Sequence, residues 1–196
     1  MRRFPEIVTI TGIVVLLVAL PGLAQTRTPG PDTIAVGAGV GFLAPANEED
    51  DSARRFEAAT GTVEAFLDYH YNAHVSIRGS YGWAQPAFEG TDDDALRRQH
   101  VAVSVAYGWP LGSFRPHASI GGGAFFLSHR QGNGRVGRDI TKPGGVLGWG
   151  LEYYLRTFAL RTEMNVHMLT VDDELPEVGR QTPSAFTWVF GVKVPF

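Results

Sequence analysis

The chain has no cysteine among its 196 residues. Disulfide bonds therefore cannot stabilise it, and the thiol that would carry the lipid of a bacterial lipoprotein is missing. After residue 24 it also has no apolar run that approaches the roughly 20 residues of a membrane-spanning helix. The charge is nearly balanced, with 17 lysines and arginines against 20 aspartates and glutamates, so nothing in it indicates a nucleic-acid partner. These absences leave a soluble domain or a membrane protein built from alternating strands.

The N-terminus has the three parts of a secretory signal peptide. Two arginines precede an apolar run at residues 7–20, and small residues follow before the chain turns polar. We expect cleavage between Ala24 and Gln25, which divides the chain into a signal peptide, 1–24, and a single domain, 25–196. The alternative is an uncleaved anchor, for which this run is short.

The last twelve residues alternate strictly between two kinds of side chain. Large apolar residues occupy every second position, and smaller or charged residues lie between them. A lipid-facing strand requires this pattern, because its outward side chains must be apolar while its inward ones can be small or polar. The alternative is a strand of a soluble β-sandwich with an aromatic core. The apolar face consists of Phe186, Trp188, Phe190, Val192, Val194 and Phe196.

Seven earlier segments show the same period of two. The eight predicted strands are residues 33–44, 58–70, 74–87, 97–109, 115–127, 144–155, 158–170 and 184–196. Their connections alternate between short turns and longer polar segments, which is typical of bacterial outer-membrane barrels. In the fifth strand alone, Phe125 and Phe126 compete for the apolar face. The pattern predicts an all-β fold: a closed antiparallel up-and-down transmembrane barrel of about eight strands.

At this point the chain resembles small outer-membrane β-barrel proteins of the OmpA/OmpX kind, over everything that follows the signal peptide. The resemblance includes the terminal Phe196, which is similar to the C-terminal aromatic signal that the barrel-assembly machinery recognises. It implies a location in the outer membrane of a Gram-negative cell envelope. The expected partners are outer-membrane lipid and lipopolysaccharide, with the assembly machinery during biogenesis, and the expected state is a monomer.

The charged residues of the predicted strands fall mainly on the face opposite the large apolar side chains. An eight-stranded barrel is only wide enough to be filled by its own side chains, so we expect a polar core that holds the interior closed. The alternative is a narrow channel for ions or a small solute, lined by Arg78, Arg161, Glu163 and Lys193. The predicted interior network is Glu64, Asp68, Arg78, Glu152, Arg161, Glu163 and Lys193.

Catalytic signals are weak in this sequence. His117 and Ser119 form a His-x-Ser pair similar to that of a lipid A deacylase, but the topology places them at the periplasmic end of a strand. Ser128 and His129 lie at the outer rim, yet adjacent strand residues point to opposite faces. We therefore expect no catalytic residues, cofactor or metal, although a lipid-modifying enzyme of the outer leaflet remains an alternative. The remaining histidines, which lack metal-binding spacing or belong with the interior charges, are His70, His74, His100 and His167.

The long connections carry charges of both signs. Acidic clusters occupy 48–51, 92–94 and 172–177, whereas the connection after residue 128 is basic. The simplest interpretation is solvated loops that pair across the rim; the alternative is binding of divalent cations or lipopolysaccharide phosphates. Taken together, the sequence predicts a non-enzymatic barrel with a structural or surface-interaction role.

Overall fold

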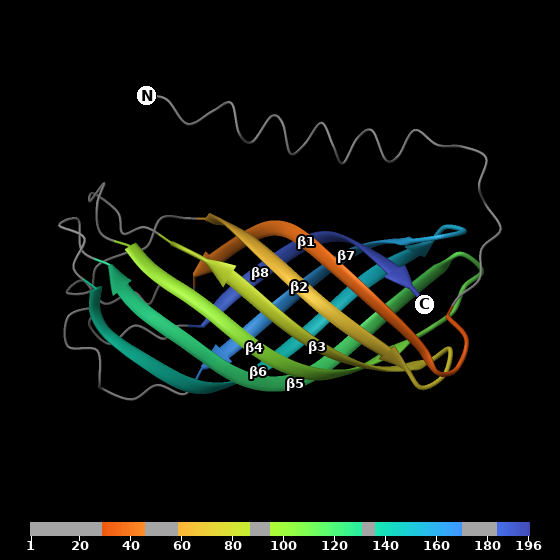
Figure 1. The fold of residues 1–196 in the computed structure, drawn as a ribbon, viewed down its shortest axis with the longest axis horizontal. Coiled ribbons are helices and arrows are strands. Elements are labelled where there is room, and N and C mark those ends of the chain that lie inside the picture. Colours follow the sequence, from red (N-terminus) through yellow and green to blue (C-terminus); the bar gives the residue numbers. More distant parts are fainter. Residues whose placement is uncertain (1–28, 46–58, 87–94, 131–135, 170–183) are drawn as a thin grey trace, which may run out of the picture.

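The computed structural model describes residues 29–45, 59–86, 95–130, 136–169 and 184–196. Eight antiparallel strands form one closed barrel in which each strand pairs with its neighbours in sequence, and β1 also pairs with β8 (Figure 1). No helix among the described residues is long and apolar enough to cross a membrane. The predicted all-β barrel of eight strands is confirmed. The strands are β1 (Thr33–Pro45), β2 (Thr60–His70), β3 (Val75–Ala84), β4 (Ala95–Gly108), β5 (Phe114–Arg130), β6 (Val136–Tyr154), β7 (Ala159–Leu169) and β8 (Ala185–Pro195).

The seam between the first and last strands closes the barrel through a long ladder. Val40 lies opposite Val63 of β2 on one side and Phe190 of β8 on the other. Beyond the ladder, the backbone N–H of Phe196 donates to the Ile34 carbonyl over 2.7 Å. The closed ring leaves no sheet edge along these paired strands, which is the usual solution to the edge-strand problem.

The two ends of the barrel differ. The end that carries the short turns 71–74, 109–113 and 155–158, together with the C-terminus, is called the turn end here. At the opposite end β4, β5 and β6 extend farther than the other strands (Figure 1). This asymmetry matches the predicted alternation of short and long connections, except in the β5–β6 hairpin.

That hairpin is longer than the sequence suggested. The predicted strands 115–127 and 144–155 are in fact Phe114–Arg130 and Val136–Tyr154. The prediction was wrong because glycines and Pro143 were interpreted as a loop, whereas pairing continues to Ser128 and Asp139.

Pro143 is tolerated within β6 because of the side toward which its nitrogen points. The N–H of Tyr154 donates to Ser113, toward β5, so the backbone groups of odd-numbered β6 residues point toward β7. In the described part of the chain, pairing between β6 and β7 begins only at Gly144 opposite Leu169. The missing donor of Pro143 therefore faces the side where β6 extends past β7, as expected for proline at a strand edge.

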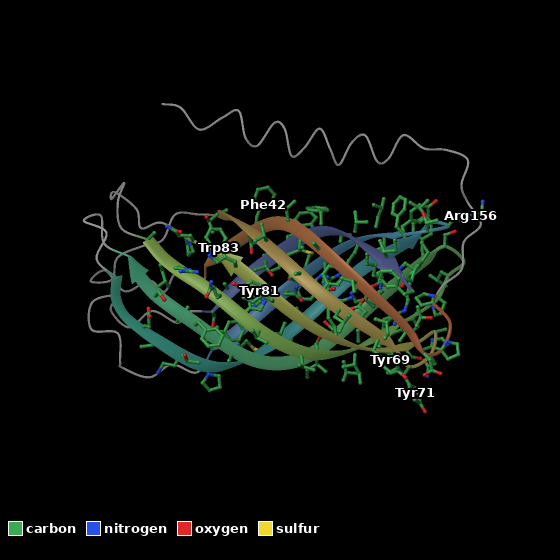
Figure 2. All side chains as sticks on the ribbon, in the orientation of Figure 1. Phe42, Tyr69, Tyr71, Tyr81, Trp83 and Arg156 are labelled. Atoms are coloured by element: carbon green, nitrogen blue, oxygen red, sulfur yellow. The ribbon has the colours of Figure 1, made fainter. Side chains whose placement is uncertain are left out.

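Burial alternates along the strands and separates two faces. The ambiguity in β5 is resolved: Phe125 is 0% exposed in the interior, and Phe126 is 39% exposed on the outside. Outward aromatic side chains lie toward both ends of the barrel, with Phe42 and Trp83 on one side of its middle and Tyr69 and Tyr71 on the other (Figure 2). The exterior is therefore an apolar band with aromatic side chains toward both ends, as is typical of outer-membrane barrels.

The predicted signal peptide, 1–24, lies outside the described residues, and its removal remains a prediction. Expression in a Gram-negative host should yield a mature protein whose first residue is Gln25. Edman sequencing or intact-mass measurement of the membrane fraction checks this. A mature chain that still begins at Met1 would contradict cleavage and favour an uncleaved anchor.

Candidate functional site

Arg78 lies at the centre of the polar interior. Its Nε and Nη2 atoms donate to Asp68 of the neighbouring strand β2 over 2.5 and 2.9 Å. Nη2 also approaches Glu152 at 3.3 Å, and Nη1 donates to Glu163. One buried guanidinium therefore contacts three carboxylates from three strands, and such charge-assisted bonds are the stronger hydrogen bonds of proteins.

Two further cations complete the cluster. Lys193 of β8 donates from Nζ to Asp68 over 3.0 Å and to Glu152 over 2.7 Å. Arg161 of β7 contacts Glu163 at 2.8 Å through Nε, and its Nη1 lies 3.4 Å from Glu64. All seven side chains of the predicted network thus lie in the interior, buried, and are joined by direct contacts.

Sequence reasoning missed three members of this cluster. Arg115 donates from Nη1 to Glu152 over 3.1 Å, and its other nitrogens donate to backbone carbonyls of the 71–74 turn. His117 Nε2 lies 2.8 Å from Glu163, and the Tyr154 hydroxyl donates to Glu152. The sequence pattern could have identified Arg115 and His117, because they share the face of β5 that carries Phe125. They were missed because the sequence did not decide which face of that strand points inward.

With Arg115 included, the cluster holds four carboxylates and four Lys or Arg side chains. Removing charges from water costs several kcal/mol per ion, and pairing with good hydrogen bonds is needed to offset that cost. The balance of the described charges satisfies this requirement. The carboxylates are Glu64, Asp68, Glu152 and Glu163, and the cations are Arg78, Arg115, Arg161 and Lys193.

Next to the charges, away from the turn end, lies a small polar cavity of about 10 Å³. Its wall includes Ser80, Ser104, Asn165 and His167. The ring of His167 packs edge-on against that of His100, with centroids 4.9 Å apart, and its Nε2 lies 3.2 Å from the Thr187 hydroxyl. A volume of this size is enough for about one water molecule.

Farther from the turn end, the interior contains a cluster of apolar side chains. Phe125 and Leu127 are almost completely buried and belong to a cluster contributed by β4, β5, β6 and β7. The Arg98 guanidinium lies over the Phe125 ring, 5.1 Å from its centroid. The interior therefore has an ionic layer toward the turn end and, toward the opposite end, an apolar layer beside which the Arg98 and Lys142 side chains are also buried. The apolar layer consists of Leu96, Ala102, Phe125, Leu127, Ile140, Val146 and Leu169.

The candidate catalytic pair is enclosed within the barrel. His117 and Ser119 are both buried on the inner face of β5, and His117 is held by Glu163. His70, which the sequence placed beside a turn, points inward to Lys193 Nζ at 3.4 Å. No group of three or more metal-ligating side chains lies together within the described ranges.

Some predicted features cannot be placed. The charged segments 48–51, 92–94 and 172–177, and the side chain of His129, lie outside the described residues. Ser128, by contrast, lies on the outward face of β5, away from the interior charges. Phe196 is 79% exposed at the turn end, and its role as an assembly signal stays a prediction.

Residues 11–196 match the family of the outer membrane protein beta-barrel domain. Among curated proteins, none matches this sequence significantly.

Three solved barrels illustrate the shared fold. The N-terminal β-barrel domain of Pseudomonas aeruginosa OprF is 14% identical, with 86% of this chain and 100% of that chain covered and a TM-score of 0.57. The attachment invasion locus protein Ail of Yersinia pestis is 12% identical, with coverages of 85% and 99% and a TM-score of 0.58. Neisserial surface protein A is 12% identical, with coverages of 84% and 96% and a TM-score of 0.62. The chain therefore belongs to the outer membrane protein β-barrel domain family and resides in the cell outer membrane.

Proposed function

We propose that this protein is a closed barrel with a structural or surface-interaction role in the outer membrane, and that it is neither an open pore nor an enzyme. The observation that carries the proposal is the buried ion-pair network, which connects β2, β3, β5, β6, β7 and β8 across the interior. An ion that crosses the barrel must separate these pairs, and breaking a buried pair is strongly unfavourable.

The apolar layer supplies a second barrier in series with the first. Phe125 and Leu127 lie in the interior beyond the ionic cluster, beside the buried Arg98 and Lys142 side chains. Hydrophobic constrictions oppose ion passage because water withdraws from them. A closed interior is thus supported by two kinds of packing, and loss of one leaves the other in place.

The absence of enzymatic activity is proposed from the position of the candidate nucleophile. Ser119 is buried inside the barrel wall, whereas a lipid substrate lies outside it. A site on the outer leaflet would need its nucleophile on the outward face or at the rim. We also propose that the protein is a monomer and that the barrel-assembly machinery recognises its C-terminal Phe196.

Single-channel recording tests the closed interior. The refolded mature chain in a planar bilayer should show no discrete openings, and the Arg161→Ala variant should also remain silent because the apolar layer persists. A combined Arg161→Ala and Phe125→Ala variant disrupts both layers and should conduct more than either single variant. Heat-dependent gel mobility shows in each case that the barrel is folded.

Discrete openings in the natural protein would overturn the proposal. If Arg161→Ala changed their amplitude, the interior would be the path, and a narrow channel for ions or a small solute would be the better assignment.

A further inference from the structure

Polar side chains gather on the outward surface of β3 to β6, at the end opposite the turn end. In one row across the strands, Trp83 pairs with Gln99, Gln99 with Phe126, and Phe126 with Thr141. The next row, one step farther from the turn end, pairs Arg97 with Ser128 and Ser128 with Asp139. Gln85 follows Ala84, the partner of Arg98, and so continues this second row beside Arg97. We call these two rows the outer polar patch; its members are Trp83, Gln85, Arg97, Gln99, Phe126, Ser128, Asp139 and Thr141.

The patch lies at the depth where lipid headgroups begin. From Tyr107 at the turn end to Arg97, β4 rises ten residues. At about 3.3 Å per residue and a tilt of about 40°, this corresponds to about 25 Å along the membrane normal, the height of the apolar band of such barrels. Between them the outward residues Val101, Val103 and Val105 are apolar and exposed. Arg97 is therefore placed at the outer boundary of the hydrocarbon.

The described outward positions at the seam, on the other side of the barrel, differ in chemistry. At the seam, Phe42 lies opposite Trp188, and Ala44 lies opposite Phe186. These outward positions are wholly apolar or aromatic. The outer polar patch thus lies on β3 through β6, the side on which β4, β5 and β6 extend beyond the other strands (Figure 1).

Charge and donor type indicate what would lie against this surface. Arg97 is exposed, and none of the ion pairs between described residues involves it. A guanidinium matches a phosphate through two parallel N–H bonds. Asp139, the carboxylate of the same row, is two strands away, about 10 Å at the usual strand spacing, so it does not occupy the space next to Arg97.

We propose that the outer polar patch binds the phosphorylated sugar headgroup of an outer-leaflet glycolipid of the lipid A class. Arg97 binds the phosphate. Gln85, Gln99 and Ser128 supply hydrogen-bond donors and acceptors for the hydroxyl and amide groups of the sugar. The rings of Trp83 and Phe126 lie at the level where aromatic side chains pack between headgroup and acyl chain. The inference goes beyond the closed interior and does not depend on it, because it concerns the opposite face of the same strands.

The test compares lipids that differ only in phosphate. Refolded mature protein in dodecylmaltoside micelles is titrated with bisphosphorylated lipid A and with the same lipid after removal of its phosphates, and native mass spectrometry measures the bound fraction. The natural protein should prefer the phosphorylated lipid by about tenfold, the order expected for one exposed charge-assisted contact. Arg97→Gln should abolish this preference. Arg97→Lys should keep only part of it, because the charge remains but the two parallel N–H donors of the guanidinium are lost.

Arg156 provides the matched control, because it is exposed in the β6–β7 turn at the other end of the barrel (Figure 2). Arg156→Gln should bind both lipids like the natural protein. Undiminished discrimination by Arg97→Gln would overturn the proposal. An equal loss in Arg97→Gln and Arg156→Gln would also overturn it, because it would show attraction to net charge and not a site. Heat-dependent gel mobility confirms that each variant is folded.

Discussion

Replacing Arg78 with methionine should lower the free energy of unfolding by about 3–5 kcal/mol, the usual cost of removing one partner from a buried ion pair. The side chain that is lost contacts Asp68, Glu152 and Glu163. After the substitution, four carboxylates would share the three remaining cations of the cluster. These carboxylates are buried, so the loss should exceed that of a surface charge.

Chemical denaturation in lipid vesicles, followed by tryptophan fluorescence and gel mobility, measures this change. Arg156→Met is the matched control, since it removes an exposed arginine and should alter stability by no more than about 0.5 kcal/mol. A double variant, Arg78→Met with Asp68→Asn, should recover part of the loss because it also removes the charge of the carboxylate to which Arg78 donates through two nitrogen atoms. Equal stabilities for Arg78→Met and Arg156→Met would show that the interior charges are hydrated and not paired.

Substituting Gly123 with alanine should destabilise the barrel by about 1–3 kcal/mol, and valine should cost more, as expected for overpacking against a fixed backbone. An added Cβ would lie 2.7 Å from the Cα and 2.9 Å from the Cβ of Ala102, and would also contact the Val101 carbonyl oxygen. These atoms belong to the adjacent strand β4, so relief requires that the two strands separate. The close approach on this inner face requires glycine.

Gly79→Ala is the control for this second prediction. Gly79 is also a strand glycine, but an added Cβ there has no other atom within 4 Å. Its substitution should leave the yield of refolded, heat-modifiable protein unchanged, while Gly123→Val should reduce it sharply. If both variants refolded with equal yield, the inner wall of the barrel would accommodate a side chain at position 123, and the prediction would be wrong.

The sequence predicted the barrel well because the period of two tests each strand independently. In β2, for example, Glu64 and Asp68 share one face and Val63 and Leu67 the other, and the interior position of both acids follows. The same reasoning assembled the seven network residues without knowledge of their distances. It could not show which cations meet which carboxylates, because the pairing depends on the stagger of strands distant in sequence.

Its failures came from local composition that competed with the pattern. Arg115 was missed because Phe125 and Phe126 hid the phase of β5. The length of the β5–β6 hairpin was missed because Pro143 resembles a loop residue until its orientation relative to β7 is known. The sequence also did not reveal the apolar layer around Phe125. In a sequence, an apolar side chain that points inward looks the same as one that faces lipid.

The contact between Lys193 and Asp68 joins residues 125 positions apart in the chain. The contact joins β8 to β2 across the interior, so the ion-pair network is complete only when the last strand has joined the barrel. A partly assembled barrel with an open seam would expose the charged side chains of the interior, which is costly wherever they meet hydrocarbon. Ring closure and completion of the ion-pair network are therefore linked on the folding path, and contacts between residues so distant in the sequence form slowly. Lys193 therefore couples closure of the barrel to the pairing of the charges inside it.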